Sequence, residues 1–127
     1  MQRIPTHNFI LHELDESLAD QLSKAAGPWH TFHFAGSTSE CLSLAERLPA
    51  NVIFCNAEPC QYRALLHEMK KRGLRLSVVV VSRIPEISEW LDALDAGATD
   101  YCAAPFEQPH VSWLIQSALL ASQHARA

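Results

Sequence analysis

Residues 76–103 read LSVVVVSRIPEISEWLDALDAGATDYCA, and this stretch decides the fold class. Leu76–Val81 is rich in β-branched residues and has no polar alternation, which is typical of a parallel strand covered on both faces. Pro85–Ala96 has the periodicity of a helix, and Gly97 ends it. The apolar positions of this helix, spaced i, i+3, i+4 and i+7, are Ile87, Trp90, Leu91 and Leu94. A short strand, Thr99–Ala103, follows, so the stretch predicts a strand–helix–strand unit.

The same alternation extends outward over the rest of the chain. Further strands are expected at Asn8–His12, Trp29–Phe34 and Asn51–Cys55. Further helices are expected over Asp15–Ala26, from the caps Ser37-Thr38-Ser39 to Leu48, from Pro59 to the C-cap Gly73, and from Pro109 to about Gln123. Five alternating strands and helices with short connections predict an α/β fold, with a parallel sheet covered by helices on both faces. Ligand sites in such sheets lie beyond the carboxyl ends of the strands.

Composition sets the class of protein. The 127 residues are 48% hydrophobic with a net charge of −4, which predicts one globular domain over residues 1–127. Basic residues cluster only around Lys70-Lys71-Arg72, so a nucleic-acid surface is not expected. No stretch approaches the roughly 20 apolar residues of a membrane span, and the N-terminus lacks the apolar core of a signal peptide. We therefore expect a cytoplasmic protein without a membrane partner.

Four cysteines, Cys41, Cys55, Cys60 and Cys102, form no CxxC pair, so a zinc site is not supported. Cys55 is expected at a strand end, near Cys102 in space, which raises a redox switch as one interpretation. His12, at a neighbouring strand end, makes a nucleophile–base pair with Cys55 a second one. No Lys or Arg is expected beside Cys55 to lower its pKa, and no third orienting group is apparent. A buried neutral thiol is therefore favoured, and the chain is not expected to be an enzyme.

A family resemblance rests on the C-terminal third. Ala96-Gly97-Ala98, Asp100-Tyr101 and Ala104-Pro105-Phe106 resemble the end of the fourth helix, the fifth strand and the following loop of bacterial response-regulator receiver domains. The spacing between Pro49 and Pro59, and the Ser that ends Val79–Ser82, resemble the third and fourth strands of that family. The resemblance implies a flavodoxin-like (βα)5 doubly wound sheet with strand order 2-1-3-4-5.

The resemblance also implies a phosphorylation pocket, whose roles this sequence fills poorly. The phosphoacceptor position is Cys55, or Asn56 if the register slips by one, and neither is a carboxylate. The lysine position holds Ala104. Only Ser82 matches the family's Ser/Thr role. The candidates for the acidic pair are His12-Glu13 or, favoured by the spacing of the next helix, Glu13-Leu14, followed by Asp15. No metal or other cofactor is therefore expected.

Other positions keep features of the family. Tyr101 stands where receivers carry a switching aromatic, although simple packing would also explain it. A cis peptide bond is expected before Pro105. Trp90 and Trp113 are candidate anchors on the surface of the fourth helix, fifth strand and fifth helix, although core packing would equally explain each of them.

The resulting hypothesis is a stand-alone pseudo-receiver in two-component or phosphorelay signalling. It would act on a signalling partner such as a histidine kinase or output protein, or form a homodimer through that surface. Two alternatives stay open: a redox or catalytic thiol protein using Cys55, and a phosphorelay member phosphorylated by an unusual route.

Overall fold

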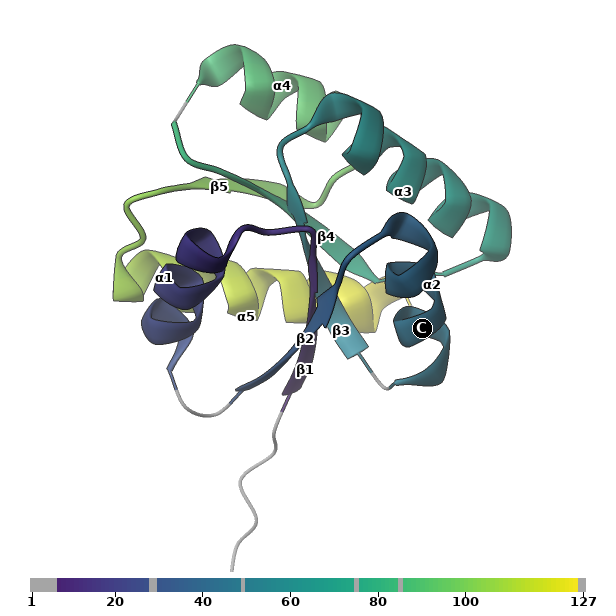
Figure 1. Ribbon diagram of the computed structural model, residues 1–127, viewed down its shortest axis with the longest axis horizontal. Helices are drawn as coiled ribbons and strands as arrows, with labels where there is room; N and C mark the ends of the chain where they lie inside the picture. Colours follow the sequence, from purple (N-terminus) through teal and green to yellow (C-terminus); the bar gives the residue numbers. More distant parts are fainter. Residues whose placement is uncertain (1–6, 28–29, 49, 75, 85, 126–127) are drawn as a thin grey trace, which may run out of the picture.

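The computed structural model describes residues 7–27, 30–48, 50–74, 76–84 and 86–125, in which strands and helices alternate (Figure 1). The strands are β1 (His7–His12), β2 (His30–Ala35), β3 (Ala50–Asn56), β4 (Ser77–Ser82) and β5 (Asp100–Ala103). The helices are α1 (Glu16–Ala26), α2 (Thr38–Arg47), α3 (Pro59–Arg72), α4 (Ile87–Asp95) and α5 (Gln108–Ala125). Trp29, Pro49 and Pro85, which were predicted at or near element ends, lie outside the described residues. The predicted order of elements is confirmed.

The strands form one parallel sheet in the order β2-β1-β3-β4-β5, which confirms the predicted topology. Every residue of β4 is buried, as the unbroken apolar run of its sequence predicts. β2 and β5 are the edge strands. Since all strands are parallel, their carboxyl ends meet at one edge of the sheet, where the candidate site lies.

Helices cover both faces of the sheet and enclose two cores (Figure 1). One core lies under α1 and α5, and its centre is Phe9 and Phe54, whose rings meet edge to face at 5.7 Å. The other lies under α2, α3 and α4 and includes Tyr62 and Leu65. The buried hydroxyl of Ser77 donates to the carbonyl of Ala118 at 2.6 Å, which fixes α5 to β4.

Local capping explains where several helices begin and end. The Asp15 carboxylate accepts from the Leu18 backbone N–H at 2.9 Å, so Asp15 is the N-cap of α1 rather than its first residue. The Ser37 hydroxyl caps α2 in the same way. Gly73 ends α3 with φ 71°, a left-handed conformation that favours glycine.

The apolar stripe of α4 does not pack on the sheet, contrary to what its helical periodicity suggested. Ile87, Leu91, Leu94 and Trp90 are all exposed, and the one buried residue of α4 is Ala93. The helix therefore contacts the core through a small side chain and presents its large ones outward. Within the described ranges, no helix is long and apolar enough to cross a membrane.

Candidate functional site

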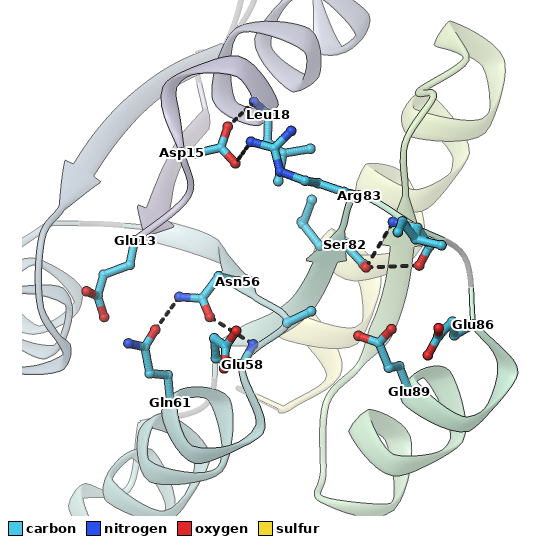
Figure 2. A pocket seen from close by; sticks show the side chains of 13 residues that line it. Glu13, Asp15, Leu18, Asn56, Glu58, Gln61, Ser82, Arg83, Glu86 and Glu89 are labelled. Carbon is cyan, nitrogen blue, oxygen red and sulfur yellow. Dashed lines mark hydrogen bonds and ion pairs between the residues drawn. The ribbon is translucent and has the colours of Figure 1, made fainter.

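A pocket of about 460 Å³ opens at the carboxyl ends of β1, β3 and β4 (Figure 2). The described residues that line it are Glu13, Asp15, Leu18, Asn56, Ala57, Glu58, Gln61, Val81, Ser82, Arg83, Ile84, Glu86 and Glu89. This is the place that the sheet topology predicts for a ligand. Its lining combines carboxylates from several elements with one cation, Arg83.

Cys55 does not line this pocket, although it occupies the expected phosphoacceptor position. Its side chain is fully buried, in the core under α2 and α3. Asn56, the next residue, lines the pocket instead, as the alternative register allowed. The Asn56 amide donates to Gln61 and accepts from the Glu58 backbone N–H at 2.9 Å, so it closes the turn into α3. The end of β3 therefore presents an amide, which is not an acceptor for a phosphoryl group.

His12 holds the Cys55 thiol from the neighbouring strand. A hydrogen bond of 3.0 Å joins His12 Nδ1 to Cys55 Sγ, and a second of 3.1 Å joins His12 Nε2 to the Thr38 hydroxyl. The contact between His12 and Cys55 was predicted from their positions at adjacent strand ends, whereas the role of Thr38 was not predicted.

Burial keeps this pair neutral. It lowers the pKa of His12, although the nearby Glu13 carboxylate acts in the opposite direction. It raises the pKa of the Cys55 thiol far above its usual range, and the charges of Cys41 and Glu13 add to the shift. A reactive thiol is usually partly exposed and close to positive charge. Cys55 has neither property, so this geometry does not activate it as a nucleophile.

The proposed proximity of Cys55 and Cys102 is wrong. Cys102 belongs to the core under α1 and α5, whereas Cys55 belongs to the core on the other face of the sheet. Cys102 is in register with Val81, and Val81 with Asn56, so Cys102 faces the same side of the sheet as Asn56. Cys55, one residue earlier, faces the other side.

Glu13 and Asp15 carry the carboxylates that β1 and its loop bring to the pocket. Leu14, the second member of the favoured acidic pair, is buried in the core. Glu13 has φ 50°, and its backbone N–H donates to the Ala35 carbonyl at 2.9 Å. Asp15 is already occupied, because it caps α1 and pairs with Arg83 across the pocket (Figure 2).

Acidic residues also gather on the far side of the pocket. Glu86 and Glu89 lie near each other at the start of α4 (Figure 2). Partial burial, a hydrogen bond with Glu86 and the charges of Glu86 and Glu58 raise the pKa of Glu89. In the part of the chain that the structure describes, no three His, Cys, Asp or Glu side chains are placed to hold a metal ion. The magnesium site that the receiver resemblance implies is therefore not matched by these side chains.

Ser82 and Ala104 meet through the backbone. The Ser82 hydroxyl donates to the Ile84 carbonyl at 3.0 Å, so it is engaged within its own loop. The Ala104 N–H donates to the Ser82 carbonyl at 2.9 Å, and the Ala104–Pro105 peptide bond is cis, as predicted. Ala104 supplies no charge, so no ammonium group reaches the pocket from this loop.

Tyr101 is partly buried against the core under α2, α3 and α4. Its hydroxyl donates to the Ile84 carbonyl at 3.3 Å. The same carbonyl thus accepts from Ser82 and Tyr101, which connects the pocket to the surface beside β5.

A second hollow, which we call the β5 cleft, lies on that surface. It has a volume of about 330 Å³, and its described lining is Glu86, Ile87, Trp90, Tyr101, Ala103 and His110. The Trp113 ring stacks on His110 with centroids 6.5 Å apart, and it continues this surface onto α5. The side chains of Trp90 and Trp113 are 43% and 59% exposed, so neither is a core residue.

Several contacts of the site were not predicted from the sequence. The pairs Arg83–Asp15, Gln61–Asn56 and Thr38–His12 each join residues of different strands, helices or loops. The periodicity of a single element does not predict such pairs. One signal was available: Asp15 precedes a helical pattern by one residue, which is typical of an N-cap.

Comparison with protein-family models and with curated protein sequences finds no match. Solved structures do match. NtrX from Brucella abortus has a TM-score of 0.79 at 21% identity, covering 95% of this chain and 28% of that chain. The chain thus spans under a third of NtrX.

Two shorter structures match nearly end to end. The signal receiver domain of an HD domain-containing protein from Pseudomonas fluorescens Pf-5 has a TM-score of 0.77 at 18% identity, with 99% of this chain and 94% of that chain covered. The receiver domain of Francisella response regulator 1452 has a TM-score of 0.71 at 18% identity, covering 93% and 98%. With the topology above, these matches show that the chain has the fold of response-regulator receiver domains.

Proposed function

We propose that this chain is a receiver-like signalling module that acts through contact with a partner protein and not through conventional aspartyl phosphorylation. The observation that carries the proposal is the residue at the phosphoacceptor position and its surroundings. Cys55 is buried and hydrogen-bonded to His12, and the pocket at the strand ends, which Cys55 does not line, holds carboxylates with one cation, Arg83, already paired. Phosphoryl transfer needs a nucleophile and positive charge to neutralise the developing negative charge. The end of β3 carries no carboxylate nucleophile, and the positive charge of Arg83 is already paired with Asp15.

The direct test is a mass measurement. The protein is incubated with acetyl phosphate and Mg²⁺, beside a phosphorylatable receiver domain as positive control, and the intact mass is recorded. We expect no gain of a phosphoryl group in this chain. A Mg²⁺-dependent gain that is lost on hydroxylamine treatment, which cleaves acyl phosphates, would contradict the proposal and support phosphorylation by an unusual route.

The competing thiol hypothesis has its own test, because one cysteine provides an internal standard. Cys60 is exposed, whereas Cys41, Cys55 and Cys102 are buried. Brief treatment of the native protein with a maleimide should label Cys60 and leave Cys55 unmodified. Labelling of Cys55 at a rate comparable to that of Cys60 would favour a redox or catalytic role for its thiol.

The surface around the β5 cleft is the proposed contact site. Trp113→Ala should weaken association with a partner while the free energy of unfolding changes little, because the ring is exposed. Phe34→Ala is the matched control, since Phe34 is 62% exposed on β2, at the opposite edge of the sheet. Equal effects of the two substitutions on association would contradict the assignment of the surface.

A further inference from the structure

We infer that the occupant of the β5 cleft is an apolar segment of a partner protein flanked by Lys or Arg side chains, and not a second copy of this chain. The inference rests on the proposed function and specifies the chemistry of the partner at the same surface. It follows from two properties of the surface: how apolar it is, and which charges surround it.

The apolar side chains around the cleft form a continuous exposed stripe. Ile87 and Trp90 line the cleft itself, and Leu91 and Leu94 continue along the same helix. Trp113 extends the stripe onto α5 through its stack on His110. The described exposed members are Ile87, Trp90, Leu91, Leu94 and Trp113. Large contiguous apolar surfaces of this kind mark interaction sites, and exposed tryptophans are frequent binding anchors.

The charged side chains of residues 84–125 have one sign. Residues 84–125 contain Glu86, Glu89, Asp92, Asp95, Asp100 and Glu107 and no Lys or Arg. Asp92 is compensated by Arg63 from α3. Glu86 lines the cleft, and Glu107 directly precedes α5, one turn before His110. Among the described residues that line the cleft, none is a Lys or Arg.

A second copy fits this surface badly. In a two-fold dimer the same patch meets itself, so Glu86 and Glu107 of one copy approach the acidic residues of the other. Like charges brought together at an interface disfavour that partner. A segment that carries Lys or Arg beside its apolar side chains fits this surface better. Its apolar side chains cover the exposed stripe, and its Lys or Arg side chains pair with the acidic residues around the cleft.

The experiment uses two synthetic peptides of equal length with the same Trp and Leu residues, one flanked by Lys and the other by Glu. Binding to the intact chain is measured by fluorescence anisotropy at two salt concentrations. The Lys-flanked peptide should bind at least about tenfold more tightly, and added salt should weaken its binding.

Variants locate the contact and separate charge from apolar area. Glu86→Gln and Glu107→Gln should each weaken binding of the Lys-flanked peptide about two- to fivefold, the range for one exposed charge pair. Trp113→Ala should weaken it about tenfold. Glu40→Gln, at an exposed position on α2, and Phe34→Ala on β2 should leave it unchanged. Unfolding curves of each variant show that the fold is retained.

Three outcomes would overturn the inference, and they differ in what they say about the proposed function. If both peptides bind equally, or neither binds, the occupant is not a basic segment. If the chain instead forms a dimer in sedimentation that Trp113→Ala disrupts, the surface is an interface but a second copy occupies it, and the proposed function stands. If Trp113→Ala alters neither peptide binding nor self-association, the surface itself is wrong and both proposals fail.

Discussion

At the scale of single residues, the buried pair of His12 and Cys55 makes stability depend on pH. Burial lowers the pKa of His12 in the folded state below its ordinary value of 6.5. Above about pH 6.5 the imidazole is neutral in both the folded and the unfolded chain, so burying it costs no proton and the folded state has its full stability. As the pH falls, the unfolded chain binds the proton first. The free energy of unfolding should therefore fall from about pH 6.5 down through the folded pKa of His12.

His12→Asn tests this, because the amide retains a polar group toward Cys55 but does not titrate. Urea unfolding between pH 7 and pH 5 should show a smaller loss of stability in this variant than in the parent chain. His67→Asn, at an exposed position on α3, is the control and should not change the slope. An identical pH dependence for His12→Asn and the parent would show that His12 does not carry the effect.

Cys55 itself can be tested against a cysteine of similar burial. Cys55→Ala removes the sulfur that His12 Nδ1 contacts and leaves a buried ring nitrogen unpaired, at a cost of about 1 to 3 kcal/mol beyond the lost packing. Cys102→Ala removes the same group from the other core, where the thiol has no hydrogen bond to another described residue. Chemical denaturation should show the larger loss for Cys55→Ala. Equal losses would mean that the hydrogen bond contributes nothing measurable.

At the scale of elements, α4 is attached by its small side chain and displays its large ones. Leu91 is 56% exposed, whereas Leu65 of α3 is fully buried. The same substitution should therefore have effects of different size. Leu65→Ala should lower the free energy of unfolding by about 2 to 5 kcal/mol, and Leu91→Ala by less than about 1 kcal/mol. Urea titration of both variants measures this. A large loss for Leu91→Ala would mean that the outer face of α4 packs against the fold.

At the scale of the whole molecule, charge is divided along the chain. Residues 84–125 carry six carboxylates without Lys or Arg, so with a net charge of −4 the remainder has a formal excess of two positive charges. The electrostatic field of such a charge distribution attracts or repels a charged partner before contact forms. For the Lys-flanked peptide we therefore expect salt to slow association strongly and to change dissociation little.

Stopped-flow fluorescence gives the two rate constants separately. The double variant Glu86→Gln with Glu107→Gln should flatten the salt dependence of the association rate, and Trp113→Ala should instead speed dissociation. A salt effect confined to dissociation would argue against long-range attraction.

The sequence predicted the fold because its signals are local and repeated. Unbroken apolar runs such as Val78–Val81 and caps such as Ser37 each indicate one element, and the order of the elements determines the parallel sheet. The helical periodicity predicted α4 correctly, but it does not show whether the large or the small side chains face the sheet. That choice depends on how closely the helix approaches β5, where only Ala93 is buried.

The candidate site was predicted only in outline. Adjacent strand ends brought His12 to Cys55 as expected, because neighbouring strands have a fixed register. Neighbouring residues of a strand point to opposite faces of the sheet, so a register shift of one residue decides which side chain at the end of β3 faces the pocket. From the sequence, both Cys55 and Asn56 were candidates for that position. The Arg83–Asp15 pair was missed because long side chains from distant loops meet only once the fold exists.

The backbone at Glu13 has a consequence for selection in the laboratory. Its φ of 50° is a left-handed conformation that glycine and asparagine adopt readily and that costs other residues about 1 kcal/mol. A library randomised at this position and sorted for thermal resistance alone should therefore discard glutamate in favour of glycine or asparagine. The natural chain retains a carboxylate there at the expense of its own folding. Substitution of Glu13 can therefore test whether the pocket needs a carboxylate for a reason other than stability.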